Sequence, residues 1–233
     1  EVMGADGIGI VSRIDGALDF TEKLLATNPL FARANPLITD RVSKIKEQNR
    51  HYLAHEYFNR DWHPMHFATM AKWMESAKLT YACSAHYLDH LDILNLTAEQ
   101  QAFLTKVTDP MFKETVRDFM VNQQFRKDYW VKGARKITDL ERIEGVRRQK
   151  VILTTPRVNV PMKITALLGE VSLQESIYGP LLDSLSDHKV HAFSDLERAL
   201  KGQNIQFNQL FQAVILLVGA GHIGLVQEDS AQA

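Results

Sequence analysis

The sequence predicts a mainly α-helical protein, in which a helical N-terminal domain is followed by a small α+β winged-helix-like C-terminal domain. Three observations lead to this fold class. Apolar residues recur at helical spacing through most of residues 1–125, β-branched and aromatic residues become frequent after Phe125, and the end of the chain alternates short helices with extended stretches. With 233 residues and 45% hydrophobic content, the chain can bury a core.

The first two predicted helices lie before residue 60. Residues 13–26 place apolar side chains on one helical face, and Asn28-Pro29 ends this helix because a residue before proline avoids helical geometry. Asn35 followed by Pro36 predicts the start of a second helix, since Asn caps free backbone amides and proline is tolerated in the first turn. The apolar stripe of this helix continues toward Phe58.

The middle of the chain carries clear signals for the starts of helices. His63-Pro64 predicts a helix that runs to about Lys78, followed by a short strand or extended connection over residues 79–85. Thr97 and Gln100 form a capping box, and Asp109-Pro110 predicts the start of a further helix.

The C-terminal part contains a different order of elements. We expect a helix at 177–186, an extended stretch at 189–193, a helix opened by a Ser194/Glu197 capping box, a helix at 207–218 and an extended stretch at 223–226. Helix, strand, helix, helix, strand is the order of a winged-helix unit.

The change in character after Phe125 predicts three parts. They are a helical domain over residues 1–133, a connecting segment with a short strand over residues 134–160, and a winged-helix-like domain over residues 161–233.

Charge and composition narrow the functional classes. The 27 Lys and Arg residues nearly balance the 28 Asp and Glu residues, so no overall positive field draws the molecule to nucleic acid or to a membrane. The apolar stretch Ala213–Ala220 is too short to span a bilayer, and Cys83 alone can form no internal disulfide. We therefore expect a cytoplasmic protein, and because the sequence begins at Glu1 rather than at Met, we expect it to be a piece of something longer.

Several histidines lie close together in the sequence, so a metal-dependent enzyme is an alternative function. His51, His55 and Glu56 share one region with His63 and His66, and imidazole and carboxylate groups bind metals. The zinc-protease motif, however, requires a second His where this sequence has Asn59. We therefore expect no metal site, and the same holds for His86 and His90.

Methyl transfer by a Rossmann-like enzyme requires a Gly-rich turn directly after a buried strand. The cluster from Gly4 to Gly9 has no strand before it and no βαβ pattern after it, so we interpret it as a flexible N-terminal arm. The sequence also lacks a Gly-x-Ser-x-Gly turn. We therefore expect no catalytic residue and no cofactor site in this chain.

A nucleic-acid-binding regulator is a second alternative. The stretch from Arg126 to Arg148 is rich in Arg and Lys and includes Tyr129 and Trp130, a mixture that can grip phosphate. Acidic residues dilute this stretch, and residues 207–218 are too apolar for a helix that reads bases. Nucleic acid is therefore not the partner that we expect.

Six short motifs, in order along the chain, resemble one known family. They are His55–Asn59, Leu94–Gln101, Asp109–Pro110, Glu114–Phe119, Asn122–Asp128 and Val131–Gly133. Together they resemble the predicted methyltransferase regulatory domain over about residues 50–135. In bacterial proteins this domain follows a class I S-adenosylmethionine-dependent methyltransferase domain, including enzymes similar to protein-lysine methyltransferases.

The resemblance implies a non-catalytic, regulatory role. Such a region would pack on a class I methyltransferase domain of the same protein and help to position a protein substrate. S-adenosylmethionine is implied for that catalytic domain, which this chain lacks. Six residues within the motifs are our candidates for the interface: His55, Glu56, Tyr57, Asn59, Arg126 and Asp128.

Overall fold

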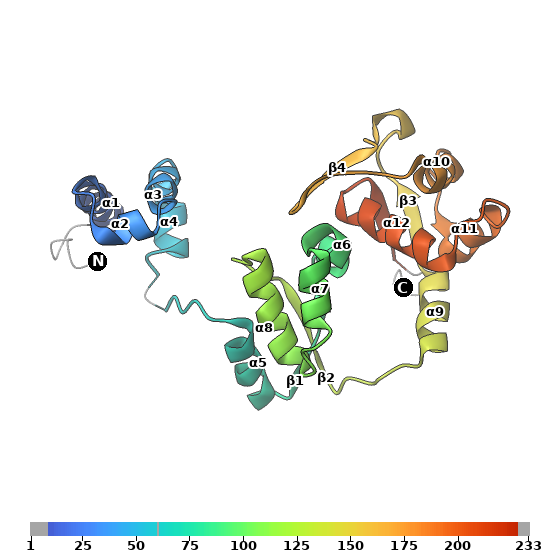
Figure 1. Cartoon of the computed structure of the whole chain (residues 1–233), viewed down its shortest axis with the longest axis horizontal. Coiled ribbons are helices and arrows are strands. Elements are labelled where there is room, and N and C mark those ends of the chain that lie inside the picture. The colour runs from blue at the N-terminus through green and yellow to red at the C-terminus, as the bar shows by residue number, and fades with distance from the viewer. Residues whose placement is uncertain (1–8, 60, 228–233) are drawn as a thin grey trace. The chain divides into compact units, whose positions relative to one another are not determined.

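The computed structural model describes residues 9–59 and 61–227, which form two compact units divided between Met65 and His66 (Figure 1). Residues 4–8 of the predicted glycine-rich arm lie outside the described residues, and Gly9 directly precedes the first helix. In the described ranges, no helix is both long and apolar enough to cross a membrane.

In its described residues, the first unit has four helices around a small core. They are α1 (Ile10–Ala26), α2 (Leu30–Ala34), α3 (Ile38–Lys46) and α4 (Arg50–Glu56). Ile14 and Leu18 of α1 pack with Leu53 of α4, and all three are buried. The helix predicted over residues 13–26 is therefore present, and it begins a turn earlier than expected.

The second predicted helix of this unit is wrong in two respects. Asn35 does not cap a helix that starts at Pro36; it ends α2, where its Nδ2 donates to the carbonyl of Phe31 at 3.0 Å. In addition, the predicted second helix is not continuous, because α3 ends at Lys46. The Asn49 side chain accepts a hydrogen bond from the His51 amide at 2.8 Å and so caps the start of a separate helix, α4. Asn is a preferred cap, so this local signal overrides the continuous apolar stripe.

The second unit begins with helices packed around a two-stranded sheet. Its elements are α5 (Phe67–Ser76), β1 (Leu79–Ser84), η1 (Tyr87–His90), α6 (Asp92–Asn95), α7 (Ala98–Leu104), α8 (Pro110–Val121) and β2 (Asp128–Lys132). β1 and β2 are antiparallel, from Leu79 opposite Lys132 to Ser84 opposite Asp128.

Sequence signals located most of these elements. The Thr97/Gln100 capping box and the Asp109 cap with Pro110 in the first turn are confirmed. The predicted start at His63-Pro64 is wrong, because α5 begins at Phe67 after a cap position at His66.

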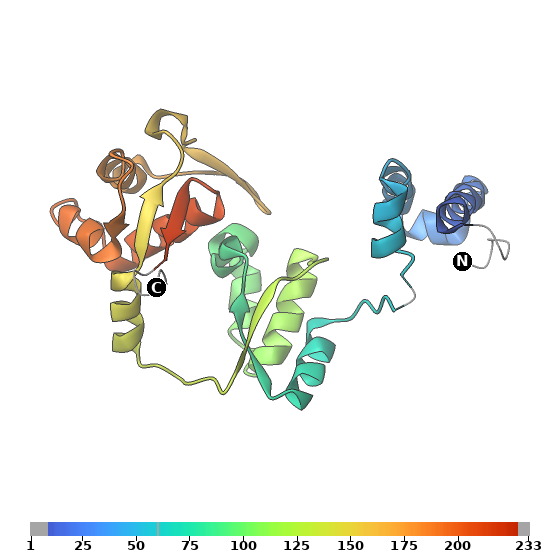
Figure 2. The ribbon, with the colours of Figure 1, turned by 180° about the vertical axis from the view of Figure 1, so that it is seen from behind.

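The rest of the second unit is built on a three-stranded antiparallel sheet in the order β6-β3-β7 (Figure 2). Its elements are α9 (Asp139–Arg148), β3 (Lys150–Leu153), η2 (Arg157–Asn159), β4 (Lys163–Ala166), β5 (Gly169–Ser172), α10 (Glu175–Ser184), β6 (His191–Ala192), α11 (Phe193–Ala199), α12 (Phe207–Gly219) and β7 (Ile223–Val226). β4 and β5 form a separate hairpin.

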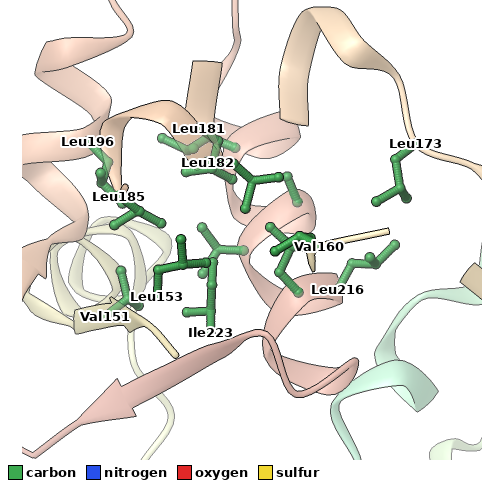
Figure 3. Close-up of a cluster of buried hydrophobic side chains, with 14 of the residues drawn as sticks. Val151, Leu153, Val160, Leu173, Leu181, Leu182, Leu185, Leu196, Leu216 and Ile223 are labelled. Carbon is green, nitrogen blue, oxygen red and sulfur yellow. The ribbon is translucent and has the colours of Figure 1, made fainter. Parts of the chain in front are cut away.

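The largest hydrophobic core lies between this sheet and its helices. Figure 3 shows Leu181, Leu182 and Leu185 of the α10 region facing Val151, Leu153 and Ile223 of the strands, and all six side chains are buried. α12 adds further buried residues, Leu210, Ala213, Val214, Leu216 and Leu217. The apolar helix predicted over residues 207–218 is thus a core helix.

The prediction of a mainly α protein with a separate winged-helix-like domain is wrong. The described residues contain three small sheets, so the protein is of mixed α/β type. The central strand β3 lies before the predicted start of the winged helix at residue 161, and Leu91 and Leu94 belong to the same core as α10 and α12. The C-terminal elements therefore depend on partners outside residues 161–233.

Two local errors contributed to this misassignment. Helix α9, with its Thr138/Glu141 capping box, lies in the predicted connecting segment. The Ser194/Glu197 capping box is absent because α11 already begins at Phe193, and Glu197 bonds Arg147 of α9 instead. The three predicted domain ranges stay a prediction.

Candidate functional site

The second unit contains a charged cluster centred on Arg126, which we call the Arg126 centre. Arg126 binds Glu114 at 2.9 Å, Asp118 at 2.5 Å and Asp128 at 2.9 Å. Glu114 and Asp118 are four residues apart on α8 and therefore share one helical face. Asn122 ends α8 in the left-handed conformation, with φ of 51°, and the chain then continues through Arg126 into β2.

Aromatic rings form one wall of the Arg126 centre. The Arg126 Cζ atom lies 4.3 Å from the centroid of the Phe67 ring, and the Tyr81 and Trp130 rings pack edge to face at 5.6 Å. Tyr81 and Trp130 are opposite each other across β1 and β2. The Tyr81 hydroxyl donates to Glu114 at 3.1 Å and accepts from Arg126 at 3.2 Å. These contacts join α5, α8, β1 and β2.

Burial and charge both act on these groups. Burial alone would lower the pKa of the Arg126 guanidinium, but hydrogen bonds to Asp128 and Glu114 raise it above its usual value. Burial raises the pKa of Asp118, an effect that Arg126 opposes. Burial also raises the pKa of Tyr81, and the negative charge of Glu114 adds to the rise. The Arg126 centre thus keeps a permanent cation among three carboxyl groups.

A second arginine binds the segment beside the Arg126 centre. Arg117 is 9% exposed, and it donates to the carbonyl of Asp89 at 2.7 Å and lies 3.5 Å from the Asp92 carboxylate. Asp89 accepts from Ser84 Oγ at 2.7 Å. Between Arg117 and Arg126 lies a small polar cavity of about 50 Å³. The buried Arg117 therefore attaches the η1 and α6 segment to α8.

A larger cavity of about 810 Å³ also borders η1. One wall comes from the segment with Leu88 and Leu94, and a second from Phe125 and Lys127 before β2. The third wall is strand β4. This cavity is large enough for several side chains of a bound molecule.

The six predicted interface residues fall into both units. Arg126 and Asp128 are bonded to each other, and their side chains are only 17% and 9% exposed. His55, Glu56 and Asn59 are exposed at the end of α4 and just after it. Tyr57 is half-buried against the core of the first unit, with its ring 5.9 Å from that of Trp62. Their interface role stays a prediction.

The histidines proposed for the metal alternative are exposed: His51, His55, His63 and His66. Across residues 9–59 and 61–227, no three His, Cys, Asp or Glu side chains come together in an arrangement suited to a metal ion. His66 instead packs its ring 5.4 Å from that of Phe119.

The partners of Arg126 were not predicted from the sequence. The spacing of Glu114 and Asp118 was visible as an i, i+4 pair on a helix, and it could have indicated a shared basic partner. The aromatic wall could not be found in this way, because Phe67, Tyr81 and Trp130 are brought together by three different elements.

The chain is similar to known proteins over a range that includes the Arg126 centre. The family described as predicted methyltransferase regulatory domain matches residues 49–132, which confirms the resemblance given by the six motifs. The uncharacterized protein sll1526 of Synechocystis sp. is 40% identical over 213 residues, which cover 91% of this chain and 42% of that protein.

Solved structures resemble this fold at low sequence identity. PKMT2 from Rickettsia typhi superposes with a TM-score of 0.58 and 16% identity, covering 90% of this chain and 45% of that one. Its complex with AdoHcy gives a TM-score of 0.56 and 14% identity, covering 91% and 44%. The chain therefore spans less than half of the length of each of these relatives.

Proposed function

We propose, from the regulatory-domain match over residues 49–132, that this chain is the non-catalytic, regulatory part of an S-adenosylmethionine-dependent methyltransferase. In this proposal it packs on a class I methyltransferase domain of the same protein and helps to position a protein substrate. The match to the family is the observation that carries the proposal. The relatives that share this region are more than twice as long, which leaves room for a catalytic domain in them.

The pairing of the strands supports a role other than methyl transfer. Each strand pair in the described part of the chain is antiparallel. A dinucleotide or nucleoside cofactor in a Rossmann-like fold is held at the ends of parallel strands, where a helix begins. AdoHcy is bound in the PKMT2 structure, and we assign the corresponding cofactor to the catalytic domain rather than to this chain.

Exposed apolar side chains support packing against another domain. On α8, Phe112 and Phe119 are 57% and 69% exposed, and a spacing of seven residues places them on one face of the helix. On α1 and α2 of the first unit, Phe20 and Phe31 are 45% and 62% exposed. Large apolar groups of this kind commonly mark surfaces that a partner covers.

The candidate interface residues fit this role in two different ways. His55, Glu56 and Asn59 are exposed and can contact the methyltransferase domain directly. Arg126 and Asp128 are mostly buried, so they act on the interface by fixing α8, which carries Phe112 and Phe119 on its exposed face.

Calorimetric titration with S-adenosylmethionine tests the non-catalytic assignment. The chain is titrated as it stands, and the control is the part of the Synechocystis relative outside the 213 matched residues, expressed as a separate polypeptide. We expect binding heat from the control alone. Saturable binding of S-adenosylmethionine to this chain would overturn the assignment.

A further inference from the structure

The large cavity in the second unit runs along the free edge of strand β4. Five consecutive residues from Lys163 to Leu167 line this cavity, whereas no residue of β5 does. Side chains alternate between the two faces of a strand, so a cavity that touches consecutive residues of a single strand follows its edge. Among the described strands, β4 pairs only with β5.

The register of the hairpin determines which backbone groups face the cavity. The Leu173 amide donates to the Met162 carbonyl at 2.8 Å, and bonded pairs alternate along an antiparallel ladder. Ile164 and Ala166 therefore bond to β5, opposite Val171 and Gly169. By this alternation, the N–H and C=O groups of Lys163 and Thr165 point away from β5. Outside the hairpin, neither residue forms a backbone hydrogen bond with a described residue.

The remaining walls provide apolar contacts and one cation. Leu88, Leu94 and Phe125 face the edge, and Phe125 is 71% exposed. Asp89 is already engaged by Ser84 and His86. Lys127, in contrast, is exposed at the cavity and forms no ion pair within the described ranges. An acidic group on the bound molecule would complement this charge.

From this geometry we infer that the cavity binds an extended peptide segment, which adds to β4 as a third strand and places an acidic side chain near Lys127. Backbone hydrogen bonds at Lys163 and Thr165 provide affinity, and the apolar walls accept alternate side chains. The inference rests on the proposed function, because it takes the bound peptide to be part of the protein that is methylated. It adds the class of segment that the chain recognises, an extended one with apolar and acidic residues.

Peptide binding to the isolated chain tests this inference without any methyl transfer. The probe is a fluorescein-labelled peptide, Ser-Val-Thr-Val-Asp-Val-Thr-Gly. A second labelled peptide, with Lys in place of Asp, is used for comparison. We expect the chain to bind the Asp peptide more tightly, and Lys127→Glu to reverse the preference. Lys106→Glu, at an exposed position just after α7 that does not line the cavity, is the control and keeps the preference.

Changes in the chain and in the peptide test whether backbone hydrogen bonds contribute to binding. Thr165→Pro removes one outward N–H without touching the bonds to β5, so binding is lost, whereas Thr165→Val retains it. N-methylation of alternate residues in the peptide abolishes binding in one register and spares it in the other. Circular dichroism of Thr165→Pro verifies the fold, and wild-type binding by a folded Thr165→Pro variant would overturn strand addition.

Hydrogen exchange separates this inference from the proposed function. With the peptide bound, the amides of Lys163 and Thr165 gain protection that they lack in the free chain. If the peptide gives no protection although the chain binds the part of the Synechocystis relative outside the 213 matched residues, the inference fails and the proposed function stands. If that part protects these two amides and displaces the peptide, β4 is an interdomain contact and the inference is overturned.

Discussion

The guanidinium of Arg126 lies over the ring of Phe67, with 4.3 Å between Cζ and the ring centroid, while its nitrogens bind three carboxylates. Arg126 thereby holds α5 against α8 and β2. Arg126→Ala leaves the three carboxylates without their cation, and removing one partner of a buried ion pair costs about 3 kcal/mol or more of unfolding free energy. Urea unfolding measures this loss.

Two variants check that charge is the cause of the loss. Removing the unpaired carboxylates by Glu114→Gln and Asp118→Asn in the Arg126→Ala background should restore part of the stability. Arg142→Ala, whose ion pair with Asp139 is exposed, should leave the unfolding free energy unchanged. Equal losses for Arg126→Ala and Arg142→Ala would contradict the account of the Arg126 centre.

A second prediction concerns pH and the pair that links α9 to α11. Arg147 donates to Glu197 at 2.8 and 2.9 Å, and these bonds lower the pKa of the Glu197 carboxyl from its usual value of 4.5. A depressed pKa in the folded state stabilises the protein above the unfolded-state value, and this stability is lost as the pH falls through the folded-state value. Glu197→Gln should therefore lower the thermal midpoint at pH 7.

The same comparison at low pH supplies the control. The difference between wild type and Glu197→Gln should shrink as the pH drops below about 4.5, where the carboxyl of the unfolded chain takes up a proton, and it should be lost once the pH is below the lower folded-state pKa, where the carboxyl is protonated in both states. Glu75→Gln, at an exposed position with no ion pair among the described residues, should give similar midpoints to wild type at both pH values. A difference for Glu197→Gln that stays constant from pH 7 to pH 3 would be inconsistent with the pair.

A third prediction concerns the close approach of η1 to α12. A Cβ atom at Gly219 would lie 2.6 Å from the Leu88 side chain, so Gly219→Ala forces Leu88 of η1 to shift. Overpacking of this kind costs about 1–3 kcal/mol, which chemical unfolding can measure. Leu88→Ala in the same chain should reduce the cost of Gly219→Ala. Gly145→Ala, in α9 and with open space around it, should raise stability slightly.

Much of the secondary structure could be predicted because its signals are local. Asp109 with Pro110 and Thr97 with Gln100 mark helix starts within four residues of sequence, and both are present in the structure. Ser194 failed as a cap because β6 pairs with β3 up to Ala192, which starts α11 directly at Phe193. That pairing joins residues about forty apart in sequence, and no local pattern reports it.

The Arg126 centre was predictable only in part. The sequence singled out Arg126 and Asp128 through a family motif, and the structure places them in direct contact. The spacing of Glu114 and Asp118 on α8 indicates a shared basic partner without identifying it as Arg126. The packing of Phe67 does not follow from spacing, because Phe67 comes from a different helix. The free edge of β4 was likewise not visible, since residues 163–172 lack strong strand signals and their pairing leaves one side open.

A fourth prediction concerns the exposed face of α8. Phe112 and Phe119 contact solvent over more than half of their surface, so replacing both by Ser should change the stability of the isolated chain very little. If the methyltransferase domain covers this face, the same double variant should weaken association with it. Val190→Ser, at an exposed site just before β6, is the matched control and should bind like wild type.

The central claim, that this chain is the regulatory partner of a methyltransferase domain, is tested most directly by association. Wild-type chain is titrated calorimetrically into the separately expressed remainder of the Synechocystis relative, the part outside the 213 matched residues. We predict saturable one-to-one binding, as expected for an interface between two domains of one protein. Absence of binding heat at the highest soluble concentrations, with both components folded, would contradict it.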